Sequence, residues 1–169
     1  MNLYFIPESE PDVEQPAVIA ARCLDMPEHA HLRDGDADIG YLFRRGEWTR
    51  GHRIVRGTAN IPQVKGELSG LFDDMLVDLL GRMPDFLIVL SWDWWEAASP
   101  RDREILVFHE LSHCVQKVDI FGTPRCNRDG TPVWGLRGHD VEEFTDVVAR
   151  YGAWNEDLRR FLAAAHEQT

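Results

Sequence analysis

Residues 106–114 read LVFHELSHC, with two histidines four positions apart and a glutamate directly after the first of them. Side chains at i and i+4 project from one face of a helix, so the rings of His109 and His113 can reach one metal ion. Glu110 is then placed to accept a proton from a water molecule whose pKa the metal has lowered. The stretch therefore predicts a Zn²⁺ site of the hydrolytic kind, with Glu110 as the catalytic general base.

The residues around this motif favour a helix. Ser99 can cap its start, Pro100 suits the first helical position, and Asp102 lies in the first turn, where the helix dipole favours a negative charge. The apolar spacing continues to Val118, so we expect the helix to end there. The preceding run DFLIVLS, residues 85–91, has the length and apolar content of a strand that is covered on both faces.

A catalytic zinc site needs a third protein ligand. His139, twenty-six positions after His113, is the first candidate, at the start of a helix expected over residues 139–152. Glu142 and Glu143 are the alternatives, because Glu142 and Asp146 have the helical spacing in which a glutamate binds zinc and an aspartate one turn later orients a ligand histidine.

The rest of the chain predicts an α+β domain, a small sheet with the motif helix and further helices. Strands over residues 39–46 and 52–62 are expected to form a hairpin, whose sheet edge could bind substrate as an extra strand. The other expected elements are helices over 17–26 and 66–82, an irregular hairpin or loop over 121–138, and a last helix capped by Asn155 that buries Leu158, Phe161 and Leu162.

Composition narrows the functional classes. The 169 residues carry a formal net charge of −11, which disfavours direct nucleic-acid binding, and no apolar run is long enough to cross a membrane. The arginines between residues 44 and 56 are interpreted as solvated side chains on the hairpin. Three irregularly spaced cysteines and an acidic N-terminus favour a cytoplasmic protein. We expect a flexible acidic arm over residues 1–16 and a single domain over residues 17–169.

Three side chains outside the motif have simpler interpretations. His29 and His31, in the stretch EHAH, have the spacing of a second metal pair, but we expect them to be surface residues. Cys114 follows His113 and should turn towards the core as a buried thiol.

The stretch LVFHELSHC, followed by LRGHDVEEF and VVARYG, resembles the phage-type metallopeptidase family. The resemblance covers about residues 17–152 and includes IGYLFRRGEWTRGHRIVRGTANIP. It implies a zincin-like fold in which His109, His113 and His139 bind zinc and Glu110 is the base, and it implies a phage or prophage origin. GHDVEEF also has a more distant likeness to a segment of SprT/Spartan-type zinc proteases, although it is one residue longer before the phenylalanine.

The leading prediction is a zinc-dependent endopeptidase that acts on protein or peptide substrates. The alternatives are a zinc hydrolase of a non-peptide bond and a non-enzymatic, zinc-organised interaction module. A fourth ligand such as Cys126 or Glu143 would close the site and indicate a structural zinc, whereas an open position near Glu110 would indicate catalysis.

Overall fold

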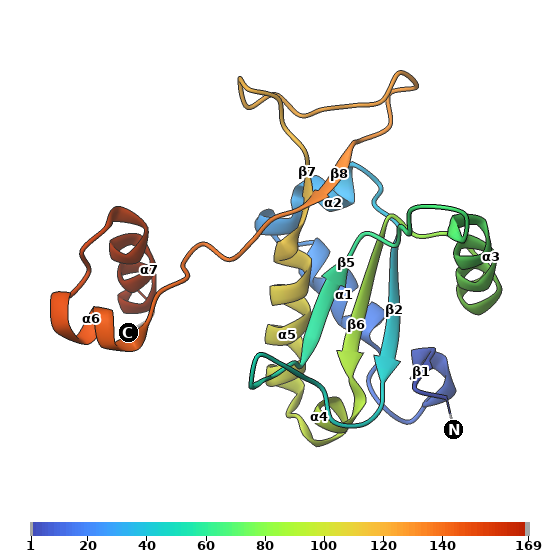
Figure 1. The fold of residues 1–169 in the computed structure, drawn as a ribbon, viewed down its shortest axis with the longest axis horizontal. Coiled ribbons are helices and arrows are strands. Elements are labelled where there is room, and N and C mark those ends of the chain that lie inside the picture. The colour runs from blue at the N-terminus through green and yellow to red at the C-terminus, as the bar shows by residue number, and fades with distance from the viewer. Residues whose placement is uncertain (1, 168–169) are drawn as a thin grey trace. The chain divides into compact units, whose positions relative to one another are not determined.

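The computed structural model describes residues 2–167 and has a mixed α+β architecture (Figure 1). Its main sheet has the strand order β1-β2-β6-β5, formed by Tyr4–Phe5, Ile39–Arg44, Phe86–Ser91 and Gly57–Asn60. β2 runs parallel to β6, and the other two pairings are antiparallel. The α+β prediction is confirmed, and the arrangement is consistent with a zincin-like fold.

The chain divides into two compact units, residues 1–137 and residues 138–169. The first unit holds the sheet together with α1 (Pro16–Leu24), α3 (Ser69–Leu80) and α5 (Pro100–His113). Its shorter helices are η1 (Pro7–Ser9), η2 (Pro27–His29), α2 (Ala30–Asp34) and α4 (Trp92–Ala97). None of the described helices is both long and apolar enough to cross a bilayer.

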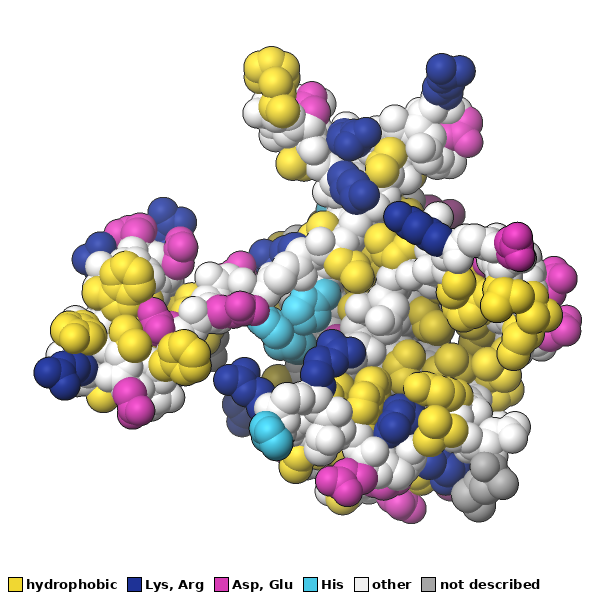
Figure 2. Space-filling model, viewed as in Figure 1, with side chains coloured by type: hydrophobic (Ala, Val, Ile, Leu, Met, Phe, Trp, Pro, Cys, Tyr) yellow, Lys and Arg dark blue, Asp and Glu magenta, His cyan; other side chains and the backbone are white. Residues whose placement is uncertain are grey.

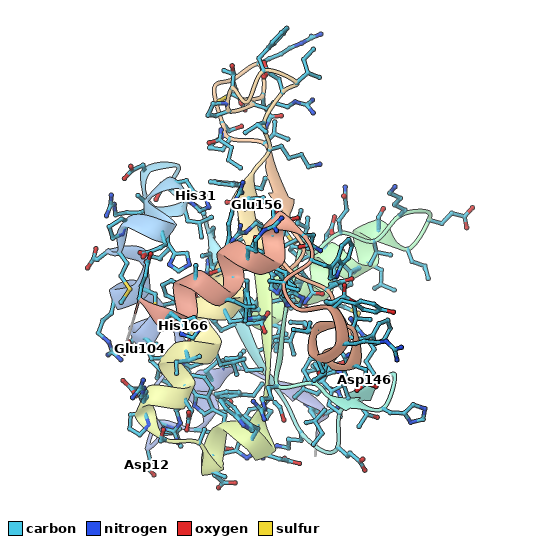
Figure 3. All side chains as sticks on the ribbon, turned by 90° about the vertical axis from the view of Figure 1, so that its left-hand side faces the viewer. Asp12, His31, Glu104, Asp146, Glu156 and His166 are labelled. Atoms are coloured by element: carbon cyan, nitrogen blue, oxygen red, sulfur yellow. The ribbon has the colours of Figure 1, made fainter. Side chains whose placement is uncertain are left out.

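β6 is buried along its whole length, as its uninterrupted apolar run predicted. Side chains alternate across a strand, so Ile88 and Leu90 pack into the core cluster that includes residues of α1 and α5. Leu87 and Val89 form a second cluster with Leu76 of α3. The sheet is thus covered on both faces, and exposed apolar side chains gather around α3 (Figure 2).

The predicted hairpin between residues 39–46 and 52–62 is wrong in its pairing. β2 and β5 do not pair with each other, because β6 inserts between them. A much smaller hairpin lies in the connection, where β3 (Thr49–Arg50) pairs with β4 (Arg53–Ile54). Its two turn residues, Gly51 and His52, have φ values of 54° and 64°, as a two-residue hairpin turn with the twist of its strands requires.

Helix α5 starts as predicted and ends earlier. The Ser99 side chain accepts a hydrogen bond from the backbone N–H of Asp102 at 3.1 Å. The helix stops at His113, not at Val118, because Cys114 begins β7 (Cys114–Gln116), which pairs with β8 (Trp134–Leu136). The intervening residues 117–133 form an extended excursion from this two-stranded ribbon (Figure 1).

Two segments outside the sheet differ from expectation in their details. In the stretch expected to be an acidic arm, Tyr4–Phe5 join the sheet, and Glu10 forms an ion pair with Arg45 at 2.7 Å. His29 is buried, so its predicted surface position is wrong. Its Nδ1 donates to the Cys23 carbonyl at 3.1 Å, and its Nε2 lies 3.3 Å from the Ser112 hydroxyl of α5.

The second unit contains α6 (Thr145–Tyr151) and α7 (Glu156–His166). The helix predicted over residues 139–152 is therefore too long, since residues 139–144 are not helical. Asn155 caps α7 as predicted, accepting a hydrogen bond from the Leu158 N–H at 2.8 Å. Leu158 is buried, but Phe161 is 58% exposed, so the predicted buried face is only partly formed.

Candidate metal centre

The last turn and a half of α5 brings the two motif histidines together. Their spacing of four residues stacks the rings on one face of the helix, with centroids 5.0 Å apart. His109 is exposed and His113 is half-buried. Their Nε2 atoms lie 3.3 Å from one another, so both nitrogens converge on the same point beside the helix.

This separation fits a shared metal ion. Zn–N bonds of about 2.0–2.1 Å at a tetrahedral angle place two ligand nitrogens about 3.4 Å apart. The Nε2 atoms of His109 and His113 are already at nearly that distance. The pair therefore needs no rotamer change to bind a zinc-sized ion.

The chain just after β8 holds one ligand in the correct orientation. The Nδ1 atom of His113 donates a hydrogen bond to the Arg137 carbonyl at 2.8 Å, which leaves Nε2 with a lone pair for a metal. Arg137 is fixed in return, because its N–H donates to the His113 carbonyl at 2.9 Å and its Nε donates to the Ser112 carbonyl at 2.7 Å. Sequence reasoning missed Arg137, since a backbone acceptor has no residue signature.

The predicted third ligand belongs to the same group of donors. One ligand atom from each of His109, His113 and His139 lies within 4.8 Å of the other two, so the group could hold a metal ion. Neither of the alternatives, Glu142 and Glu143, is a member of this group.

The carboxylate of Glu143 is engaged within the second unit. One oxygen accepts from the indole N–H of Trp154 at 2.9 Å, and the other accepts from the Phe144 N–H at 2.8 Å. The proposed helical pairing of Glu142 with Asp146 is also wrong, because Glu142 lies before the start of α6.

Glu110 occupies a very different environment from its histidine neighbours. It projects from α5 towards β5 and is only 3% exposed. Burial raises the pKa of its carboxyl to about 7, against a smaller opposing effect of a backbone hydrogen bond with Ala59. A carboxyl group with a pKa close to neutrality can both accept and release a proton under ordinary conditions.

A glycine of β5 makes room for that carboxyl group. A Cβ atom added to Gly57 would lie 2.7 Å from Glu110 Oε1 and 3.0 Å from its Cδ. The absence of a side chain at this position is what lets Glu110 lie against the strand. The sequence places a glycine here without showing what it faces, so Gly57 was not among the predicted site residues.

A cleft of about 420 Å³ opens beside these groups. His109 and Glu110 form one end of its wall, and the wall continues along α5 to Asp102. The opposite side is formed by the chain that leads from β4 into β5. β5 is the last strand of its sheet, so one of its edges has no neighbouring strand in the described part of the chain. This edge borders the site.

Comparison with known proteins identifies a family for the chain. The family model described as "Putative phage metallopeptidase" matches residues 6–166, nearly the whole chain. No match was found among curated proteins or among solved structures. The distant likeness to SprT/Spartan-type proteases stays a prediction. A metallopeptidase family implies a metal ion, and the histidine group could hold one. The chain belongs to the phage metallopeptidase family.

Proposed function

We propose that this protein is a zinc-dependent endopeptidase. In this proposal His109, His113 and His139 bind the zinc ion, and Glu110 is the general base. The observation that carries the proposal is the combination, within one turn of α5, of two convergent Nε2 atoms 3.3 Å apart and a buried carboxyl with a pKa of about 7. The family model supports the peptidase assignment.

Covalent connectivity supports His139 as the third ligand. Arg137 is bound to the end of α5 by three hydrogen bonds, to His113 and Ser112. His139 follows two residues later, and two residues of extended chain span at most about 7 Å. Its imidazole is therefore within reach of the point on which His109 and His113 converge.

The roles of zinc, Glu110 and His113 follow from their chemistry. Zinc, when bound, supplies a Lewis acid that polarises the scissile carbonyl and makes water a better nucleophile near neutral pH. Glu110 takes the proton from the attacking water and then delivers it to the leaving amine. The hydrogen bond to the Arg137 carbonyl orients the His113 ring with Nε2 towards the metal position.

The open edge of β5 supports a polypeptide substrate. An extended peptide can add to an edge strand through backbone hydrogen bonds, which do not depend on its sequence. A peptide on β5 would pass beside Gly57, where the Glu110 carboxyl is in contact with the strand. The scissile bond would then lie next to the base.

The group of donors also supports an open, catalytic site over a closed, structural one. It contains three histidines, and neither Cys126 nor Glu143 joins it in the described part of the chain. A three-ligand site leaves one position for water or substrate, whereas structural zinc sites are four-coordinate.

The test is peptidase activity of the zinc-loaded protein on a mixed peptide library, read by mass spectrometry. Wild type should cleave internal peptide bonds, chelation should abolish cleavage, and zinc should restore it. Glu110→Gln is the matched control because it keeps the shape of the side chain, and we expect it to bind zinc without cleaving. A zinc-loaded wild type that cleaves no peptide would favour the non-enzymatic module, and cleavage by Glu110→Gln at the wild-type rate would remove Glu110 from the mechanism.

A further inference from the structure

The wall of the 420 Å³ cleft combines an apolar lining with a single arginine. Its apolar part consists of Ile54, Val55, Trp94, Ile105 and Leu106. The arginine of the wall is Arg56, which directly precedes β5. The arginines of this region were expected to be solvated side chains on a hairpin. Arg56 is exposed, as expected, and it also lines the cleft next to the candidate metal centre.

Arg56 is held in place from two sides. Its carbonyl accepts a hydrogen bond from the Ser91 N–H of β6 at 2.7 Å, which fixes the backbone. Its guanidinium carbon lies 5.6 Å from the centroid of the Trp94 ring, within the range of a cation–π contact. The Arg56 side chain is exposed, so this contact orients the guanidinium and leaves it accessible to a substrate.

The guanidinium has no carboxylate partner in the described part of the chain. Arg56 takes part in no ion pair there, although the protein carries an excess of eleven negative charges. Two acidic residues line the cleft, Glu110 and Asp102. Asp102 accepts a hydrogen bond from the Ser99 hydroxyl at 2.7 Å as part of the start of α5. Figure 2 shows Lys or Arg side chains next to histidine side chains on this face of the molecule.

A substrate residue that contacts Arg56 would be close in sequence to the bond that is cleaved. Arg56 is bonded to Gly57, and Gly57 is in contact with the carboxyl of Glu110. Consecutive Cα atoms are about 3.8 Å apart, and residues of an extended peptide advance by about 3.3 Å. A substrate side chain that meets Arg56 therefore belongs to a residue within about two positions of the scissile bond.

We infer that Arg56, stacked on Trp94, is a specificity residue that selects substrates with an acidic side chain within two residues of the cleaved bond. The inference rests on the proposed peptidase function. A planar guanidinium binds a carboxylate through two parallel N–H···O bonds. A neutral side chain of the same size lacks the negative charge that strengthens this pair. The apolar wall beside it accommodates the aliphatic part of a glutamate or a neighbouring apolar side chain.

The test uses quenched-fluorescence peptides that differ at one position only. Starting from a cleaved sequence, each of the two positions on either side of the scissile bond is set in turn to Glu, Gln or Lys. For wild type, at one of these positions kcat/KM should be at least tenfold higher with Glu than with Gln. The charge reversal Arg56→Glu should remove that preference and favour Lys at the same position.

A matched variant and a binding assay separate selection from general damage. Arg53→Glu makes the same charge change on β4, outside the wall of the cleft, and should keep the wild-type preference. The affinity of labelled Glu and Gln peptides, measured by fluorescence anisotropy on the inactive Glu110→Gln protein, should show the same preference. The Arg56→Glu, Glu110→Gln double variant should lose it.

The outcomes distinguish the two levels of the argument. Wild type that cleaves peptides with equal kcat/KM for Glu and Gln at all four positions would overturn the role of Arg56 and leave the peptidase function intact. An unchanged preference in Arg56→Glu would do the same. A zinc-loaded wild type that cleaves no peptide of the mixed library, so that no starting sequence is found, would overturn both.

Discussion

Gly57→Ala is the substitution that tests the position of the catalytic carboxyl most sharply. The new methyl carbon would lie 2.7 Å from Glu110 Oε1 and 3.1 Å from its Cγ, whereas ordinary contacts begin at about 3.4 Å. The carboxyl must therefore move by about 0.7 Å or more. The backbone at Gly57 is not in the left-handed region, so alanine adds no backbone strain and the effect comes from this contact.

Misplacing a catalytic group by about 1 Å can lower the rate by about a hundredfold, so we expect kcat/KM to fall between about tenfold and a hundredfold. The free energy of unfolding should fall by about 1–3 kcal/mol through overpacking, and the zinc content should stay at the wild-type level. The assay is steady-state cleavage of one peptide, together with urea unfolding and elemental analysis.

Gly70→Ala is the control, because a Cβ at this exposed position of α3 meets no atom within 4 Å. It should leave kcat/KM unchanged and stabilise the protein by about 0.5–1 kcal/mol. If Gly57→Ala keeps wild-type kcat/KM, Glu110 does not act from the position described.

Three further predictions concern stability and pH. In metal-free protein, the folded state holds a proton on Glu110 that the unfolded state releases above pH 4.5, so this contribution to stability is lost as pH rises to about 7. The stability of Glu110→Gln relative to wild type should therefore increase by about 3 kcal/mol across that window in urea unfolding, and a constant difference would contradict the buried carboxyl. Burial lowers the pKa of His29 below its ordinary value of 6.5, so the unfolded state binds the extra proton and wild type should lose stability as pH falls below about 6.5. His29→Gln should show less of this loss, while exposed His52→Asn, which tolerates the positive φ, should behave as wild type; equal curves for all three would refute the assignment. Ser99→Ala removes the cap of α5 and should lower the free energy of unfolding by about 1 kcal/mol, with no change in zinc content, and a loss of zinc would show that the helix start is coupled to the site.

The sequence predicted correctly those features of the fold and site that depend on residues close together in the chain. The cap of α5, the convergence of His109 and His113, and the burial of β6 each follow from spacing within a dozen positions. Cys114 is buried, as expected, and its burial raises its pKa to about 12. These features required no knowledge of distant partners.

The errors arose where a partner lies far along the chain. The helix was extended to Val118 because Val115 and Val118 continue the apolar spacing, but Cys114–Gln116 instead pair with Trp134–Leu136, about twenty positions later. β2 and β5 are close in sequence and read as a hairpin, although a strand that comes later in the chain separates them. Gly57 escaped notice for the same reason, since its contact with Glu110 joins segments about fifty positions apart.

The most direct test of the central claim is the zinc content of the purified chain, measured by elemental analysis for wild type and single variants. We expect about one zinc per wild-type chain. His109→Ala, His113→Ala and His139→Ala should each lose most of it, while Glu142→Gln and Glu143→Gln should keep it, with circular dichroism showing that every variant is folded. Zinc that survives in His139→Ala but is lost in Glu142→Gln or Glu143→Gln would contradict the three-histidine site, and a folded wild type that binds no added zinc would contradict the metal centre itself.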